Sequence, residues 1–444
     1  MLGWLACAAA WAQGVPEDVP DAEAAAEADA GDDPWDRRGW GFGGLPAVNY
    51  NSDEGFGFGV VASLYRYDGH LQPYKTAINL VLFMTTKGIH NHWLEVDTLE
   101  LGGKPLRLTV RGEFSSTATN NYCGVGPEVT CDPAVAEAAI DAVDPPLQGE
   151  AREDALRHYY RLRYLMPNGS ATLRWAIDPM PHKVELLLGW RGRGIVPGDF
   201  RERDPWPHSL YASDFPGGEA GFVSLLQAGV MVDDRDNEPA PIRGYWVEGT
   251  VRAATIAFGS TYDFVGWNVT LRGYHPLGTD RVVFADRVMF DQLVGEAPVV
   301  ELVWPGGTQQ YTFYGSLNAG RGIRLARYVG KLKAMNQSEV RATFWQPEIA
   351  GVHFDVTALG FLDLGFVGAD PFDFGPAFSH PLPGTGGGCA SPSTATVVRA
   401  DAGVSPIEDW SPRSIDIKNT FSGGYDIGGS DPYVGVGWDR QDRR

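Results

Sequence analysis

Alternation of apolar and polar residues constrains this chain more than any other feature of its sequence. In residues 106–114, apolar side chains fall on one face of an extended strand and charged or hydroxyl side chains on the other. The same pattern returns in residues 184–193, 245–252 and 265–272. No apolar run approaches the roughly 18 residues of a membrane-spanning helix. The pattern therefore predicts an all-β chain.

Strand length separates two all-β architectures. A soluble β-sandwich also alternates, but its strands usually have about five or six residues, whereas the alternating segments here run for roughly 10 to 14. Their polar faces mix arginines with carboxylates, which suits a wet, cross-linked interior. We therefore predict a transmembrane antiparallel β-barrel, in which each alternating strand taken alone gives only a weak sequence signal.

Composition excludes several classes of function. The chain carries 36 Lys and Arg against 56 Asp and Glu, a net charge of -20, so nucleic acid is not an expected partner. It contains no HExxH, GxSxG or Walker lysine motif, so we expect no enzyme activity and no cofactor. His90 and His92 share a strand face and could contact a metal. The favoured interpretation is that they are ordinary polar residues near the start of a strand. The glycine-rich segment 384–388 is expected to be a loop.

The sequence predicts four segments. Residues 1–12 form a secretory signal peptide that ends in an Ala-x-Ala cleavage pattern. Residues 13–37 form an acidic, Ala-rich disordered tether. Residues 38–439 form the barrel, and residues 440–444 a polar tail. These predictions place the mature chain in the cell outer membrane.

Cys123 and Cys131 bracket a short loop. A disulfide between them suits an oxidising compartment. The alternative is two unpaired loop thiols.

The connections between the expected strands alternate between short and long. Short turns are expected at residues 102–105 and 277–280, and long loops at residues 118–156, 196–219, 295–333 and 369–388. The last part of the barrel is ambiguous. Residues 386–393 do not alternate, and either 414–421 or 433–438 could supply the closing strand.

Two segments stand out within this pattern. The glycine-rich stretch 313–330 presents Arg321-Gly322-Ile323, and the strand 361–365 carries Asp363 between Phe361 and Gly365. Alternation turns Phe361, Asp363 and Gly365 into the barrel interior, together with Glu339 on the preceding strand. A guanidinium can bridge two carboxylates, so Arg321 could lock the loop inside the barrel while Gly322 allows close backbone approach. The alternative is that Arg321 is a solvated loop residue.

This combination resembles the BamA/TamA type of outer-membrane assembly-factor (surface antigen) β-barrels. The Phe-x-Asp-x-Gly strand motif matches in full, and the Arg-Gly-aromatic loop motif in part, because Ile323 stands where the family has Phe or Tyr. Residues 396–404 resemble the family's penultimate strand. A further match resembles its periplasmic turn and consists of Asp234, Arg235, Asp236, Asn237, Arg243 and Gly244. The resemblance implies about 16 strands, with the Arg-Gly loop folded inward after strand 11.

The resemblance also implies a function. It suggests a role in outer-membrane protein assembly or translocation, carried out by a monomer that contacts outer-membrane lipids. Unfolded outer-membrane clients or separate periplasmic modules would be its partners, because residues before Trp40 leave no room for the family's periplasmic POTRA modules. The alternative is a passive outer-membrane pore or surface protein without insertase activity.

Overall fold

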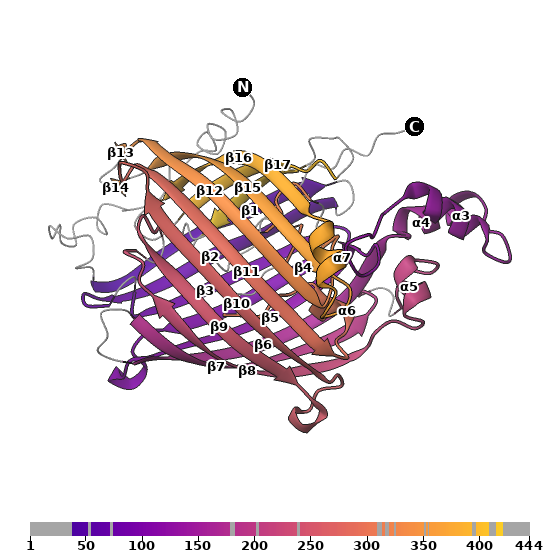
Figure 1. Ribbon diagram of the computed structural model, residues 1–444, viewed down its shortest axis with the longest axis horizontal. Helices are drawn as coiled ribbons and strands as arrows, with labels where there is room; N and C mark the ends of the chain where they lie inside the picture. The colour runs from indigo at the N-terminus through magenta and orange to yellow at the C-terminus, as the bar shows by residue number, and fades with distance from the viewer. Residues whose placement is uncertain are drawn as a thin grey trace.

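The computed structural model shows an extended, curved sheet with helices gathered at one end (Figure 1). It describes residues 38–51, 55–71, 74–177, 183–200, 204–237, 240–308, 313–315, 319–323, 326–349, 352–353, 355–392, 397–407 and 414–420. The predicted signal peptide, the tether and the polar tail lie outside these ranges, as does the candidate closing strand 433–438.

A single 16-stranded sheet forms the wall, and each strand pairs antiparallel with its neighbour in the order of the chain. Its first eight strands are β1 (Arg38–Asn51), β2 (Gly55–Asp68), β3 (Thr76–Thr85), β4 (His90–Thr98), β5 (Leu106–Asn121), β6 (Arg161–Ile177), β7 (Lys183–Pro197) and β8 (Gly221–Asp233). The other eight are β9 (Gly244–Ala254), β10 (Phe264–Pro276), β11 (Val282–Gly295), β12 (Leu332–Trp345), β15 (Val356–Gly368), β16 (Leu382–Pro392), β17 (Val397–Val404) and β18 (Ser414–Thr420). The predicted fold class and strand number are confirmed.

Alternation decides which face of the wall each side chain takes. On β9 and β10, Val251 and Val265 are exposed on the outer face, whereas Arg252, Asn268 and Arg272 are buried on the inner face. The same division holds for the exposed Leu188 and buried Arg191 and Arg193 of β7. An apolar outer face and an interior of paired arginines and carboxylates are what a transmembrane barrel requires, because lipid cannot solvate charge.

The two ends of the barrel differ. At the short-turn end, residues 99–105 and 277–281 join neighbouring strands, and the small hairpin of β13 (Glu348–Ile349) and β14 (Val352–His353) forms part of the β12–β15 connection. The long-loop end carries α3 (Pro133–Asp141), α4 (Gly149–His158), α5 (Leu210–Asp214), α6 (Val299–Leu302) and α7 (Phe374–Ser379) (Figure 1). The described residues also form two 3₁₀ turns, η1 (Leu101–Gly103) and η2 (Ile256–Phe258). Within the described ranges, no helix combines the length and apolar character needed to cross a membrane.

Two expectations about the last strands need correction. The glycine-rich segment 384–388 is not a loop but the middle of β16, which pairs with β15 on one side and β17 on the other. The doubtful segment 386–393 is therefore largely strand, and Pro392 lies at its end, where a missing ladder donor costs little. The candidate strand 414–421 corresponds to β18, which pairs with β17, and the described pairings include none between β18 and β1.

Candidate functional site: the infolded loop

The connection between β11 and β12 folds into the barrel interior. It is the connection after the eleventh strand, as the sequence predicts. Phe313 and Tyr314 are fully buried and pack with Met289, Met335 and Val367 of the wall. Buried aromatic side chains contribute strongly to packing, so this part of the loop is packed against the wall.

Arg321 lies in the same loop and is also buried. Its Nε and Nη2 atoms donate to the two carboxylate oxygens of Asp363 at 2.9 and 2.6 Å, and its backbone N–H donates to Asp363 Oδ2 at 2.9 Å. Arg321 is 5% exposed and Asp363 is fully buried. The structure thus brings the two predicted residues into a bidentate, charge-assisted contact, the strongest geometry open to such a pair.

Two further carboxylates complete the surroundings of Arg321. Its Nη1 atom donates to Glu339 of β12 at 2.8 Å and to Asp401 of β17 at 3.3 Å. Glu339 also accepts from Arg341 at 2.7 Å. The guanidinium carbon lies 3.5 Å from the centre of the Phe361 ring, so the cation is stacked as well as hydrogen-bonded. We call Arg321, Glu339, Asp363 and Asp401 the lock.

Glycines allow the loop backbone to reach the wall. Gly322 has φ +93°, and a Cβ there would lie 2.6 Å from backbone atoms of Val404. A Cβ at Gly384 would lie 2.2 Å from the Arg321 carbonyl oxygen, and one at Gly365 would overlap the Tyr314 ring. The failure of β16 to alternate has its physical reason here, because side chains at that position would exclude the loop.

Ile323 packs in the apolar cluster of Phe313 and Tyr314. It stands at the place where the motif has an aromatic residue, and it is 7% exposed.

A second contact holds the loop nearer the long-loop end. Glu301 of α6 is buried and accepts from Arg191 and, at 2.8 Å, from Arg193, both on β7. Nearby, the Gly306 N–H donates to Asp291 of β11 at 2.7 Å. We call Glu301, Arg191 and Arg193 the α6 anchor. Sequence reasoning missed it, although a lone carboxylate in the apolar run 299–302 was a signal.

The predicted turn motif forms the β8–β9 connection at the short-turn end. Asp236 accepts from the backbone N–H groups of Ile242 and Arg243 at 3.0 and 3.2 Å, and Arg243 pairs with Asp280 in the β10–β11 turn. Gly244 has φ +97°, and a Cβ there would lie 2.0 Å from the Asp234 carbonyl oxygen.

The arginine of this turn is held by the acid two residues before it. Arg235 donates to both carboxylate oxygens of Asp233 at 2.8 Å. Asp234 contributes its backbone N–H, which donates to the Tyr245 carbonyl at 2.9 Å, and Asn237 lies in the same turn. The motif therefore organises one turn and ties it to the next.

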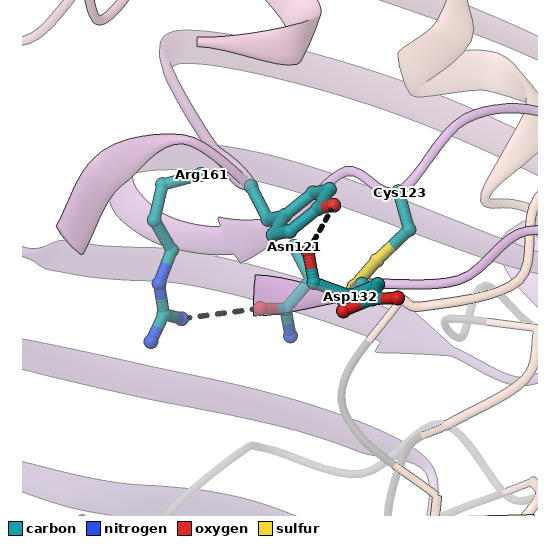
Figure 2. Close-up of a disulfide and its surroundings, with 6 residues drawn as sticks. Asn121, Cys123, Asp132 and Arg161 are labelled. Carbon is teal, nitrogen blue, oxygen red and sulfur yellow. Dashed lines mark hydrogen bonds between the residues drawn. A yellow bond between two sulfur atoms is a disulfide. The ribbon is translucent and has the colours of Figure 1, made fainter. Parts of the chain in front are cut away.

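Figure 2 shows a disulfide between Cys123 and Cys131, at the foot of the α3–α4 hairpin. The two Cα atoms are 5.3 Å apart. The Tyr160 hydroxyl donates to the Asp132 carbonyl oxygen at 2.8 Å, and Arg161 donates to Asn121 at 3.3 Å (Figure 2). The first contact holds the start of α3 near the start of β6, and the second joins the ends of β5 and β6.

The histidine pair is joined by a hydrogen bond. His90 Nδ1 lies 3.1 Å from His92 Nε2, and the Phe83 N–H donates to His92 Nδ1 at 3.3 Å. A neutral His92 that accepts at Nδ1 carries its proton on Nε2, so it donates to His90. In the part of the chain that the structure describes, no group of three or more His, Cys, Asp or Glu side chains could hold a metal ion.

Comparisons with known proteins add information on the fold. No protein-family model and no curated protein sequence matches the chain. Among solved structures, CdiB from Escherichia coli aligns with a TM-score of 0.52 and 15% identity over 84% of this chain and 60% of that one. BamA from Haemophilus ducreyi lacking POTRA domains 1–3 aligns at 0.48, with 13% identity over 86% and 69% of the two chains. CdiB from Acinetobacter baumannii aligns at 0.47, with 11% identity over 82% and 56%.

The fold follows from the sheet and from the first of these alignments. Sixteen antiparallel strands follow one another in the order of the chain, and the chain aligns with E. coli CdiB, of whose length it spans 60%. The fold that the resemblance implies is thus confirmed: this chain shares the β-barrel fold of CdiB from Escherichia coli.

Proposed function

We propose that this chain resides in the outer membrane and assembles or translocates unfolded polypeptide there, with the lock holding its infolded loop in the resting position. The observation that carries the proposal is the contact of Arg321 with carboxylates on β12, β15 and β17. One loop residue thereby ties together three strands near the end of the sheet. A device of this kind couples the position of the loop to the part of the wall nearest the last strand.

The remaining predicted features support the same location. A disulfide at the long-loop end suits an oxidising compartment, and the apolar outer face suits lipid. Outer-membrane lipids are therefore proposed as its surroundings. Unfolded outer-membrane proteins, or separate periplasmic modules that deliver them, are proposed as its partners.

The infolded loop argues against a permanently open pore. It fills interior space with the fully buried Phe313 and Tyr314, and its backbone touches β16 and β17. A passive pore would need that space for water. The loop therefore favours a gated interior.

The test is a reconstituted folding assay. A urea-unfolded eight-stranded barrel is added to liposomes that contain the purified chain, and its folding is followed by its heat-dependent gel shift. We expect the chain to accelerate folding over empty liposomes and Arg321→Ala to lose about tenfold of that acceleration, equivalent to about 1.4 kcal/mol. Arg152→Ala, on the exposed α4, is the matched control. No acceleration by the unmodified chain, together with a steady ionic current through it, would assign the passive-pore function instead.

A further inference from the structure

Four buried cations line the barrel wall near the long-loop end. They are Arg191 and Arg193 on β7, Arg252 on β9 and Lys333 on β12, none more than 7% exposed. We call these four residues the cation band. Two carboxylates serve them: Glu301 accepts from Arg191 and Arg193, and Asp291 accepts from Arg252 at 2.8 Å and from Lys333 at 3.3 Å.

The charges in this part of the wall are therefore unequal. Four cations share two acids, which leaves a formal excess of two positive charges in a buried site. Elsewhere in the interior, Arg174 has its own partner in Glu185, and Arg107 has Asp97. Buried charges are normally paired, because an unpaired charge loses its hydration without compensation. The excess marks the cation band as a place suited to an additional anion.

Arg193 shows where such an anion would bind. Its Nη1 atom donates to Glu301, whereas Nε and Nη2 have no hydrogen-bond partner in the described structure. The Nε of Arg191 is likewise without one. An Nε–Nη2 edge is a two-donor fork that matches the two oxygens of a carboxylate. Arg193 is fully buried, so this edge is a built and unused donor pair.

The infolded loop is what covers the cation band. The Trp304 ring lies over the Arg193 guanidinium at 4.7 Å, and the Gly306 N–H donates to Asp291. Glu301 is the one carboxylate that the described part of the loop brings to these arginines. Displacement of α6 would leave all four cations facing the interior with Asp291 alone.

We propose that the cation band is a docking track for an acidic segment of a polypeptide that enters the barrel, and that Glu301 compensates the charge of Arg191 and Arg193 until then. This inference rests on the proposed function, since it requires a polypeptide in the interior. The partner is an extended peptide for a geometric reason. Arg191 and Arg193 lie two positions apart on one strand, a separation of about 7 Å that equals the spacing of alternate side chains on an extended chain.

The test measures binding of a defined acidic probe. A fluorescently labelled peptide of twenty glutamates is titrated against liposomes containing the full chain, and anisotropy is recorded. Glu301→Gln keeps the shape of α6 but frees Arg191 and Arg193, so we expect at least tenfold tighter binding than to the unmodified chain. Arg193→Gln added to Glu301→Gln should remove that gain, and Lys333→Gln added instead should remove part of it. Glu150→Gln on α4 is the matched control.

Three results would overturn the proposal. The first is equal affinity of the glutamate peptide for the unmodified chain and for Glu301→Gln, with both heat-modifiable and therefore folded. The second is equal binding of a twenty-lysine peptide. The third is competition by inorganic phosphate at the same concentration of negative charge, because that would assign the site to a small anion.

The outcome is separable from that of the folding assay. Client folding without binding of the glutamate peptide removes the docking track alone. Binding without client folding removes the proposed assembly role and leaves an acidic-peptide site.

Discussion

The lock and the α6 anchor hold one loop with opposite charges. At the lock the loop supplies the cation, Arg321, and three strands supply acids. At the α6 anchor the loop supplies the acid, Glu301, and β7 supplies two arginines. A loop that slipped or reversed would bring like charges together in a buried space. The two contacts therefore specify one placement of the loop as well as stabilising it.

The lock and the α6 anchor differ in whether backbone or side chains make the contact. At the lock, Gly322, Gly384 and Gly403 bring chain against chain, with no space for a Cβ. At the α6 anchor the contact is made by side chains, with Trp304 stacked on Arg193. The lock should therefore be intolerant of both charge and volume changes, whereas the α6 anchor should respond chiefly to charge.

The largest effect is expected for Arg321→Ala. It would leave Asp363, Glu339 and Asp401 buried near one another, with Arg341 as the neighbouring cation. The repulsion between these acids should lower the free energy that keeps the loop closed by about 3–5 kcal/mol. Limited proteolysis of the reconstituted barrel should show cleavage within residues 313–330. Arg152→Ala should leave the loop as resistant as before. If Arg321→Ala stays fully resistant to proteolysis, the apolar cluster of Phe313 and Tyr314 alone retains the loop.

Gly384→Ala should come next. Its new Cβ would overlap the Arg321 carbonyl oxygen, which forces the loop backbone away at a cost of roughly 1–3 kcal/mol. Gly360→Ala on β15 is the matched control, since the nearest atom to its Cβ lies 4.0 Å away. The measurement is amide hydrogen exchange in the loop. Unchanged exchange in Gly384→Ala would mean that the backbone approach is not what restrains the loop.

Glu301→Gln should have a smaller and more local effect. The amide keeps the shape of the side chain but leaves the charge of two arginines less compensated. We therefore expect the opening free energy of residues 299–308, measured by amide hydrogen exchange, to fall by about 1–2 kcal/mol. Residues 319–323 should stay protected. Equal loss of protection in both segments would show that the lock and the α6 anchor open as one unit.

The smallest effect concerns pH. Burial raises the pKa of Glu219, which lies in the β7–β8 loop and accepts from the Val299 N–H at 2.8 Å, from 4.5 to about 7. A carboxyl whose pKa is raised in the folded state holds its proton more tightly there. The free energy of unfolding therefore falls as pH rises from about 4.5 through about 7, here by roughly 1–2 kcal/mol after allowance for partial exposure.

The check is the temperature of the heat-dependent gel shift as a function of pH. Glu219→Gln should flatten the curve in this window, and the exposed Glu150→Gln should not. A curve that keeps its slope in Glu219→Gln would assign the pH dependence to other groups.

The sequence predicted the lock better than the α6 anchor for a physical reason. Strand alternation alone turns Asp363 and Glu339 inward, and a glycine beside Arg321 suggests close approach. Glu301 and its arginines are more than a hundred residues apart, 110 for Arg191 and 108 for Arg193, so no local pattern joins them. Asp401 belonged to a recognised strand, but its contact with Arg321 depends on how the strands between them curve.

The strand β16 could not be predicted because its glycines serve tertiary contacts. Alternation arises because successive side chains face lipid and interior in turn. Gly384 breaks this pattern because the loop backbone occupies the space that its side chain would fill. Neighbouring β15 and β17 supply the ladder that propensity does not.

Arg321 and Asp363 meet and together hold the loop inside the barrel. A double-mutant cycle measures this coupling, with Arg321→Ala, Asp363→Ala and the double variant compared by the opening free energy of the loop from hydrogen exchange. We predict that the cost of the double variant falls short of the sum of the single costs by at least about 1 kcal/mol. Costs that add to within about 0.5 kcal/mol would mean that the two side chains act independently, and the lock would have to be abandoned.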